Sequence, residues 1–171
     1  MSWRSWFVNG KGFYTGKVDD RNLLKFVYEN KKYIPEKLMI DFPVIIKRMK
    51  TDPFFTLNIE YDEDTMPVEM TESFKNLMNI SSFSNLRDAL LYIAAEIMHV
   101  ENNIWFQYMS GMDGCIGEEG AIFLANGAPW SFNPKERSIS EPDFLALCKK
   151  YAEKLGVPEE DIGDIEIEYF G

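Results

Sequence analysis

The sequence predicts an α+β fold, a single domain in which helices pack on one face of a mixed or mainly antiparallel sheet. Three observations predict this class: capped helices with apolar stripes, short aromatic strands, and two strand pairs close enough in sequence to form hairpins. A purely parallel sheet is disfavoured, because its strands would be unbroken apolar runs buried on both faces. With 171 residues, 46% of them apolar, the chain can bury one core, so residues 1–171 are expected to form one globular domain.

A β-hairpin is expected at the start of the fold. Residues 2–8 and 13–18 are rich in aromatic side chains, which favour strands. The dipeptide Asn9-Gly10 lies between them and tolerates the positive φ angles of a tight turn. Alternation along the two strands would turn several of the rings toward the core.

Helices are expected next. Asp19 and Asp20 can cap a helix that runs to about residue 30, with apolar residues on one side. Pro35 and Pro43 each suit the first turn of a helix but not its interior. We therefore expect two short helices in this region instead of one long helix.

The middle of the chain predicts a strand, an acidic turn and a brief helix. Residues 54–59 are mostly apolar and read as a strand that runs into the acidic residues 60–64. Residues 71–79 follow as a short helix that begins with a capping threonine.

The clearest predicted element is a helix over residues 84–101, with Ser84 as its cap. Its apolar residues recur at helical spacing and cover most of its surface, so we expect it to be central in the fold. The main apolar stripe consists of Leu86, Leu90, Ile93, Ile97 and Val100. The remaining polar sector, expected to face solvent, holds Asp88, Tyr92, Glu96 and His99.

The last part of the chain predicts two paired strands, a helix and a final strand. Residues 104–109 and 121–124 can pair as an antiparallel hairpin around the glycine-rich segment 111–120. Residues 140–155 form a helix with a capping serine at its start and a glycine after its end. Residues 164–170 alternate between apolar and acidic residues, which predicts a half-buried strand with an acidic face. The buried stripe of the helix would consist of Phe144, Leu147, Cys148, Tyr151 and Leu155.

Charge is distributed unevenly along the chain. The net charge is −10, yet residues 1–50 hold eleven Lys and Arg against five acidic residues. Residues 51–171 hold seven Lys and Arg against twenty-three acidic residues. Such a field repels nucleic acid over most of the surface, so we predict no nucleic-acid partner and favour a basic protein partner.

Other sequence features limit the location and the chemistry. No apolar run approaches the about 18 residues that a membrane span needs, so no membrane partner is predicted. The first residues lack the apolar stretch of a secretory signal, which leads us to expect a cytoplasmic protein with reduced thiols. No cofactor is predicted, because neither a nucleotide-binding pattern nor a paired Cys/His set is present.

The glycine-rich segment 111–120 leaves three interpretations open. It is a plain connection between two strands, or the site of a small enzyme, or a divalent-cation site. In the enzyme, Cys115 would be the nucleophile and His99 or Glu118 its base. In the cation site, the ligands would be Asp113, Glu118 and Glu119. A phosphate cradle is disfavoured because the segment has three acidic residues and no Lys or Arg.

The favoured functional hypothesis is a non-catalytic protein-binding protein of the inhibitor, immunity or adaptor type. Its acidic surface would engage a basic partner, and opposite charges would speed their association. Formation of a homo-oligomer is compatible with the high aromatic content. The candidate binding residues, for which no metal is invoked, are Asp62, Glu63, Asp64, Asp164, Glu166 and Glu168.

Overall fold

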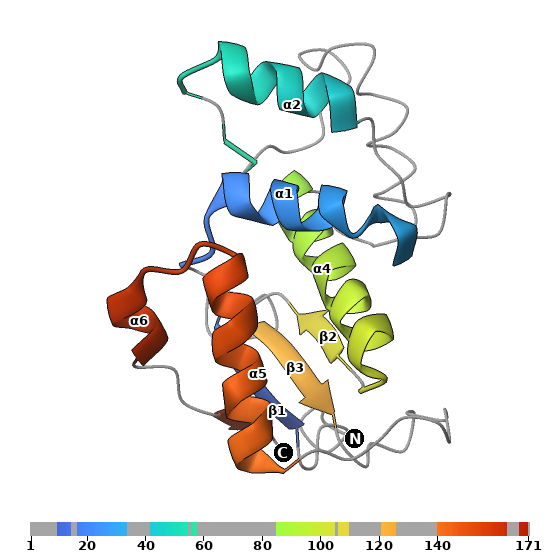
Figure 1. Cartoon of the computed structure of the whole chain (residues 1–171), viewed down its shortest axis with the longest axis vertical. Helices are drawn as coiled ribbons and strands as arrows, with labels where there is room; N and C mark the ends of the chain where they lie inside the picture. The colour runs from blue at the N-terminus through green and yellow to red at the C-terminus, as the bar shows by residue number, and fades with distance from the viewer. Residues whose placement is uncertain are drawn as a thin grey trace.

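The computed structural model covers the whole chain, and its described part is mainly helical (Figure 1). Among the residues whose side chains are described, 74% are helical and 4% lie in strands. The predicted α+β class was therefore wrong. The physical reason is that most of the described buried side chains lie on α1, α4 and α5, whose apolar stripes pack inward, while Phe106 and Tyr108 are buried in a strand. The described residues are 10–14, 17–33, 42–54, 56–57, 85–104, 106–109, 121–125, 140–163 and 168–170.

The longest described helix is α4, with 17 residues. Helix α4 contacts both α1 and strand β2, and α5 contacts α1 and α6. The helical elements are α1 (Asp20–Glu29), the short 3-10 helix η2 (Lys31–Tyr33), α2 (Phe42–Thr51), α4 (Leu86–Asn102), α5 (Glu141–Lys154) and α6 (Glu159–Gly163).

Four short strands pair through their backbones in the order β2-β3-β1-β4, and every pair is antiparallel. The pairing of β2 with β3 confirms the predicted contact between those two segments. The turn predicted at Asn9-Gly10 was wrong, because Gly10 already lies in β1, opposite Ala125 of β3 and Phe170 of β4. The strands are β1 (Gly10–Tyr14), β2 (Phe106–Met109), β3 (Ala121–Ala125) and β4 (Glu168–Phe170).

Helix α4 begins one residue later than expected. Its cap is Asn85, whose side-chain oxygen accepts from the backbone N–H groups of Arg87 and Asp88, so the assignment of Ser84 as the cap was wrong. The predicted stripe is buried except for Val100, which is 54% exposed near the end of the helix. Asn103 ends α4 in the left-handed region, with φ of 54°. The buried residues are Leu86, Ala89, Leu90, Leu91, Ile93, Ala94, Ala95, Ile97 and Met98.

Helices α1 and α5 confirm the sequence patterns that predicted them. Asp19 caps α1 by accepting from the backbone of Asn22, and Ser140 caps α5 by accepting from that of Asp143. Each helix turns its apolar stripe inward, although Leu147 is only partly buried. The inward residues are Leu23, Leu24, Phe26 and Val27 on α1, with Phe144, Cys148, Tyr151 and Ala152 on α5.

The strand predicted from residue 54 was wrong over its described part. The backbone N–H of Phe54 donates to the carboxylate of Asp52 at 2.9 Å, which closes a turn and leaves the Phe54 ring 90% exposed. Leu57 is fully buried just beyond it. The predicted strand 2–8 and helix 71–79 lie outside the described residues.

Candidate functional site

Most of the residues predicted to bind a partner, to catalyse a reaction or to ligate a metal lie outside the described part of the chain. Glu168 lies on β4, where its backbone is paired with Gly12 of β1. His99 lies in the last turn of α4. The approach of Cys115 to His99 therefore stays a prediction. The sites that fall outside the described residues are Asp62, Glu63, Asp64, Asp113, Cys115, Glu118, Glu119, Asp164 and Glu166.

The polar sector of α4 is half-buried instead of fully solvated. Burial raises the pKa of Glu96 above its ordinary value, and the nearby imidazole of His99 opposes part of that rise. Burial also raises the pKa of Tyr92, and the negative charge of Glu96 adds to it. The expectation that these side chains form a fully hydrated face was therefore wrong.

Cys148 is a core residue, as its place in the apolar stripe of α5 predicted. The side chain is 1% exposed, and burial raises the pKa of its thiol far above the ordinary value. Because the thiolate is the reactive form, Cys148 is chemically inert in the folded protein.

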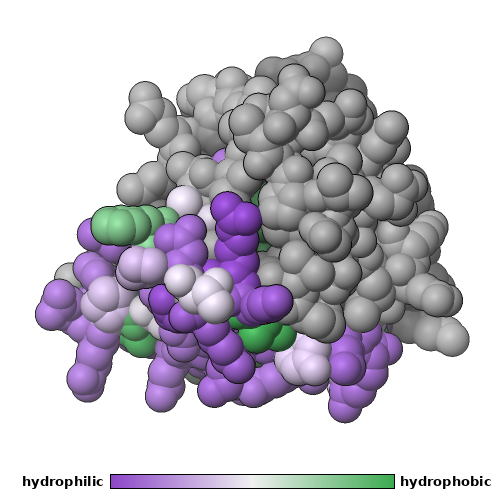
Figure 2. Space-filling view, turned by 90° about the horizontal axis from the view of Figure 1, so that it is seen from above, coloured by the Kyte–Doolittle hydropathy of each residue, from purple (hydrophilic) through white to green (hydrophobic). Residues whose placement is uncertain are grey.

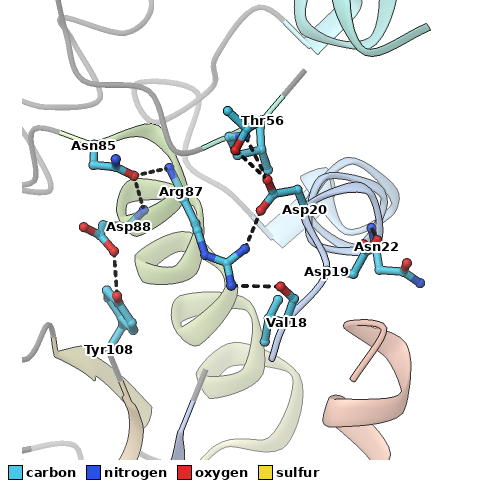
Figure 3. Close-up of polar contacts among 10 residues, drawn as sticks. Val18, Asp19, Asp20, Asn22, Thr56, Asn85, Arg87, Asp88 and Tyr108 are labelled. Atoms are coloured by element: carbon cyan, nitrogen blue, oxygen red, sulfur yellow. Dashed lines mark hydrogen bonds and ion pairs between the residues drawn. The ribbon is translucent and has the colours of Figure 1, made fainter. Parts of the chain in front are cut away.

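An ion pair joins α1 to α4 (Figure 3). The guanidinium of Arg87 binds the carboxylate of Asp20, and its second nitrogen donates to the backbone oxygen of Val18 at 2.8 Å. The other carboxylate oxygen of Asp20 accepts from the backbone N–H of Leu57 at 2.9 Å and from the hydroxyl of Thr56 at 3.2 Å. These contacts hold the start of α1, the segment 56–57 and the start of α4 together.

Two tyrosine hydrogen bonds join α4 to β2 and to α5. The hydroxyl of Tyr108 on β2 donates to the carboxylate of Asp88 at 2.7 Å. On α5, the hydroxyl of Tyr151 accepts from the side-chain amide of Asn102 at 2.6 Å. Burial raises the pKa of Tyr151, the hydrogen bond from Asn102 opposes part of that rise, and the negative charge of Glu101 adds to it.

A groove with a volume of about 450 Å³ lies between α1 and α5. Its walls carry charged and amide side chains over the buried ring of Phe26, which packs edge-on against Tyr151 with the ring centroids 5.9 Å apart. The face seen in Figure 2 is likewise mostly hydrophilic over its described part, with small apolar areas between. The groove is lined by Asn22, Lys25, Phe26, Glu29, Asn30, Lys150, Glu153 and Lys154.

The end of α5 lies close to the start of α1, beside this groove. The backbone N–H of Asp19 donates to the carbonyl of Leu155 at 2.9 Å. Gly156 follows with φ of +75°, and a Cβ placed there would lie 2.7 Å from side-chain atoms of Asn22 and Asp19. The glycine is therefore required both by its backbone conformation and by the tight contact between the end of α5 and the start of α1.

Sequence reasoning missed the groove. Lys150 and Lys154 are four residues apart and so share a helix face, which was the available signal. No local sequence pattern, however, indicates that Lys25 on α1 lines the same groove, because α1 and α5 come together only through tertiary packing. The sequence pattern by itself is that of an ordinary solvated helix face.

The acidic carboxy-terminal segment begins at α6. Glu159 and Glu160 are exposed in the first turn of this helix, and Asp161 is partly exposed. Residues 155–171 hold six acidic residues and no Lys, Arg or His. The acidic residues of α6 were not among the predicted binding residues, and they lie a few positions before Asp164, Glu166 and Glu168 in the chain.

The described residues contain neither a metal-binding group of side chains nor a membrane-spanning helix. No group of three or more His, Cys, Asp or Glu side chains there is arranged to hold a metal ion. No helix among them is long and apolar enough to cross a membrane. Comparisons with models of known families, with curated proteins and with solved structures found no match.

Proposed function

We propose that the protein is a non-catalytic protein-binding protein of the inhibitor, immunity or adaptor type, whose acidic carboxy-terminal region engages a basic protein. The observation that carries this proposal is the unbroken run of negative charge after α5. Residues 155–171 have six carboxylates without a single basic side chain. The first two of them, Glu159 and Glu160, are exposed on α6.

The position of α6, in addition to its charge, supports the proposal. Helix α6 packs against α5, a helix with a buried stripe, so its carboxylates are presented from an ordered element. Backbone N–H groups of Asp161 and Ile162 donate to the carbonyl of Pro158 at 2.9 and 3.0 Å. A preorganised acidic element gives up less conformational entropy on binding than a free tail does.

Long-range attraction is the expected mechanism. A surface of one sign steers a partner of the opposite sign, which raises the association rate more than the final affinity. The rate should therefore fall as salt rises from about 0.01 M to about 1 M, where the screening length shortens from about 30 to about 3 Å.

The test is affinity capture with the full chain from its native host, followed by association kinetics with the identified protein. We expect capture of one prominent basic protein, and loss of it with the variant Glu159→Gln/Glu160→Gln/Asp161→Asn. The matched control Glu36→Gln/Asp41→Asn/Glu136→Gln changes the net charge equally but lies outside the acidic segment. A partner whose association rate is independent of salt, or that both variants lose equally, would contradict the proposal.

A further inference from the structure

The groove between α1 and α5 holds two ammonium groups on α5 that pair with no carboxylate in the described part of the chain. Lys150 and Lys154 make no ion pair with any described residue. Their contact is with the ring of Tyr151, whose centroid lies 5.6 and 5.7 Å from the two nitrogens. The tyrosine ring attracts both cations but cancels the charge of neither.

The opposite wall of the groove adds a third cation. Lys25 of α1 lies 4.0 Å from Glu29, and both side chains are largely exposed, at 71% and 58%. A solvated pair at this distance is weak, so the ammonium of Lys25 stays available to a ligand. Three lysines thus line one hollow in a protein whose net charge is −10.

Neutral and acidic groups complete the lining. The side-chain amide of Asn22 makes no hydrogen bond with the described residues, whereas that of Asn30 already donates to the carbonyl of Phe26 at 2.8 Å. The carboxylates of Glu29 and Glu153 can accept hydrogen bonds from hydroxyl groups. Below them, the buried ring of Phe26 offers an apolar floor.

The lining discriminates among anions. Lysine is a compact point charge suited to phosphate, whereas planar bidentate recognition of a carboxylate favours arginine, and no arginine is among the described lining residues. Glu29 and Glu153 would repel an extended polyanion, and this disfavours nucleic acid and long acidic peptides. The volume of about 450 Å³ lies within the range of small-molecule sites.

We propose that the groove binds a small phosphate monoester that carries hydroxyl groups, with the chemistry of a sugar phosphate. The phosphate is held by Lys150 and Lys154 from one wall and by Lys25 from the other. The hydroxyls bond to Asn22 and to the two glutamates. The carbon skeleton rests on Phe26. This site is distinct from the acidic segment 159–168 and binds a ligand of opposite charge.

The test is isothermal titration calorimetry of the full chain with glucose 6-phosphate, with glucose and with an acidic hexapeptide. Saturable binding of glucose 6-phosphate that weakens as salt rises is expected, with no binding of glucose or of the peptide. The variant Lys150→Gln/Lys154→Gln should bind the phosphate ester about 100-fold more weakly, because each of the two lost charge-assisted contacts costs about a factor of ten.

A matched control separates the groove from overall charge. Lys47→Gln/Lys50→Gln removes two exposed lysines from α2 and should leave the affinity for glucose 6-phosphate unchanged. Circular dichroism and thermal unfolding verify that both variants are folded. Absence of saturable binding at about 10 mM ligand, an equal loss in the control, or tighter binding of the peptide than of the ester would each overturn the proposal.

Discussion

The guanidinium of Arg87 on α4 binds the carboxylate of Asp20 on α1, a residue 67 positions earlier in the chain. Each partner makes further bonds: Arg87 donates to the backbone of Val18, and Asp20 accepts from the backbone of Leu57. Because both side chains are mostly shielded from water, the loss of either partner leaves polar groups without compensation.

Removal of the Asp20 carboxylate should destabilise the fold. We expect Asp20→Ala to lower the free energy of unfolding by about 1–3 kcal/mol, because the N–H of Leu57 and the charge of Arg87 both lose their acceptor. Asp20→Asn should cost less, since one oxygen can still accept from Leu57. Urea unfolding measures both effects, and equal stability of Asp20→Ala and the unmodified protein would show that the ion pair is energetically silent.

The close contact at the end of α5 predicts a large effect from a single methyl group. Gly156→Ala should lower the free energy of unfolding by about 1–2 kcal/mol from the left-handed backbone alone. The contact with Asn22 and Asp19 at 2.7 Å should increase the loss. Gly163→Ala is the control, because nothing lies within 4 Å of its added Cβ. Thermal unfolding that ranks the two variants in the opposite order would disprove the account of this contact.

The corrected cap of α4 can be tested by a pair of substitutions. Asn85→Ala should cost about 1 kcal/mol of stability, because the backbone N–H groups of Arg87 and Asp88 lose their shared acceptor. Ser84→Ala is the comparison variant and should cost less. Denaturant unfolding of both proteins gives the two values, and a greater loss from Ser84→Ala would restore the cap that the sequence predicted.

The pH dependence of stability should report the burial of Glu96. Its pKa is higher in the folded protein than in the unfolded chain, so its contribution is most favourable below the unfolded pKa and is lost as pH rises through the folded pKa. Glu96→Gln carries no titrating carboxyl group. We expect the variant to gain stability relative to the unmodified protein as pH rises through the carboxyl range to neutrality.

Thermal unfolding at a series of pH values measures this difference. Glu153→Gln, at an exposed site on α5, is the matched control and should show a smaller change with pH. If the stability of Glu96→Gln relative to the unmodified protein falls as the pH rises from acid to neutral, then the sign assigned to the Glu96 shift is wrong. The nearby His99 reduces the size of the effect but does not reverse its direction.

Helices were more predictable than the fold class. The stripes of α1, α4 and α5 and the caps Asp19 and Ser140 depend on residues within one or two turns, so local patterns locate them. The strand assignments depended on aromatic content, which cannot distinguish a turn from a strand. Phe54, interpreted as part of a strand, lies exposed in a turn. Gly10, assigned to a turn because Asn-Gly favours tight turns, lies in β1.

The candidate groove could not be predicted, because it depends on packing between two helices that are distant in the sequence. Lys25 and Lys150 are far apart in the chain but line one groove between α1 and α5, two helices joined by the contact of Phe26 with Tyr151. Among the predicted site residues, His99 was placed on the correct helix, but its half-buried surroundings were not foreseen. Burial depends on which elements cover a face, and periodicity does not contain that information.

The amino-acid sequence by itself determined the uneven charge, the caps of α1 and α5 and most of the inward-facing stripes, because these follow from composition and from interactions among near neighbours. Only the tertiary structure decided that the described part is mainly helical, that Arg87 finds Asp20, and that three lysines share one groove. Such contacts join residues separated by long stretches of chain, and their formation depends on how all of the packed elements exclude water together.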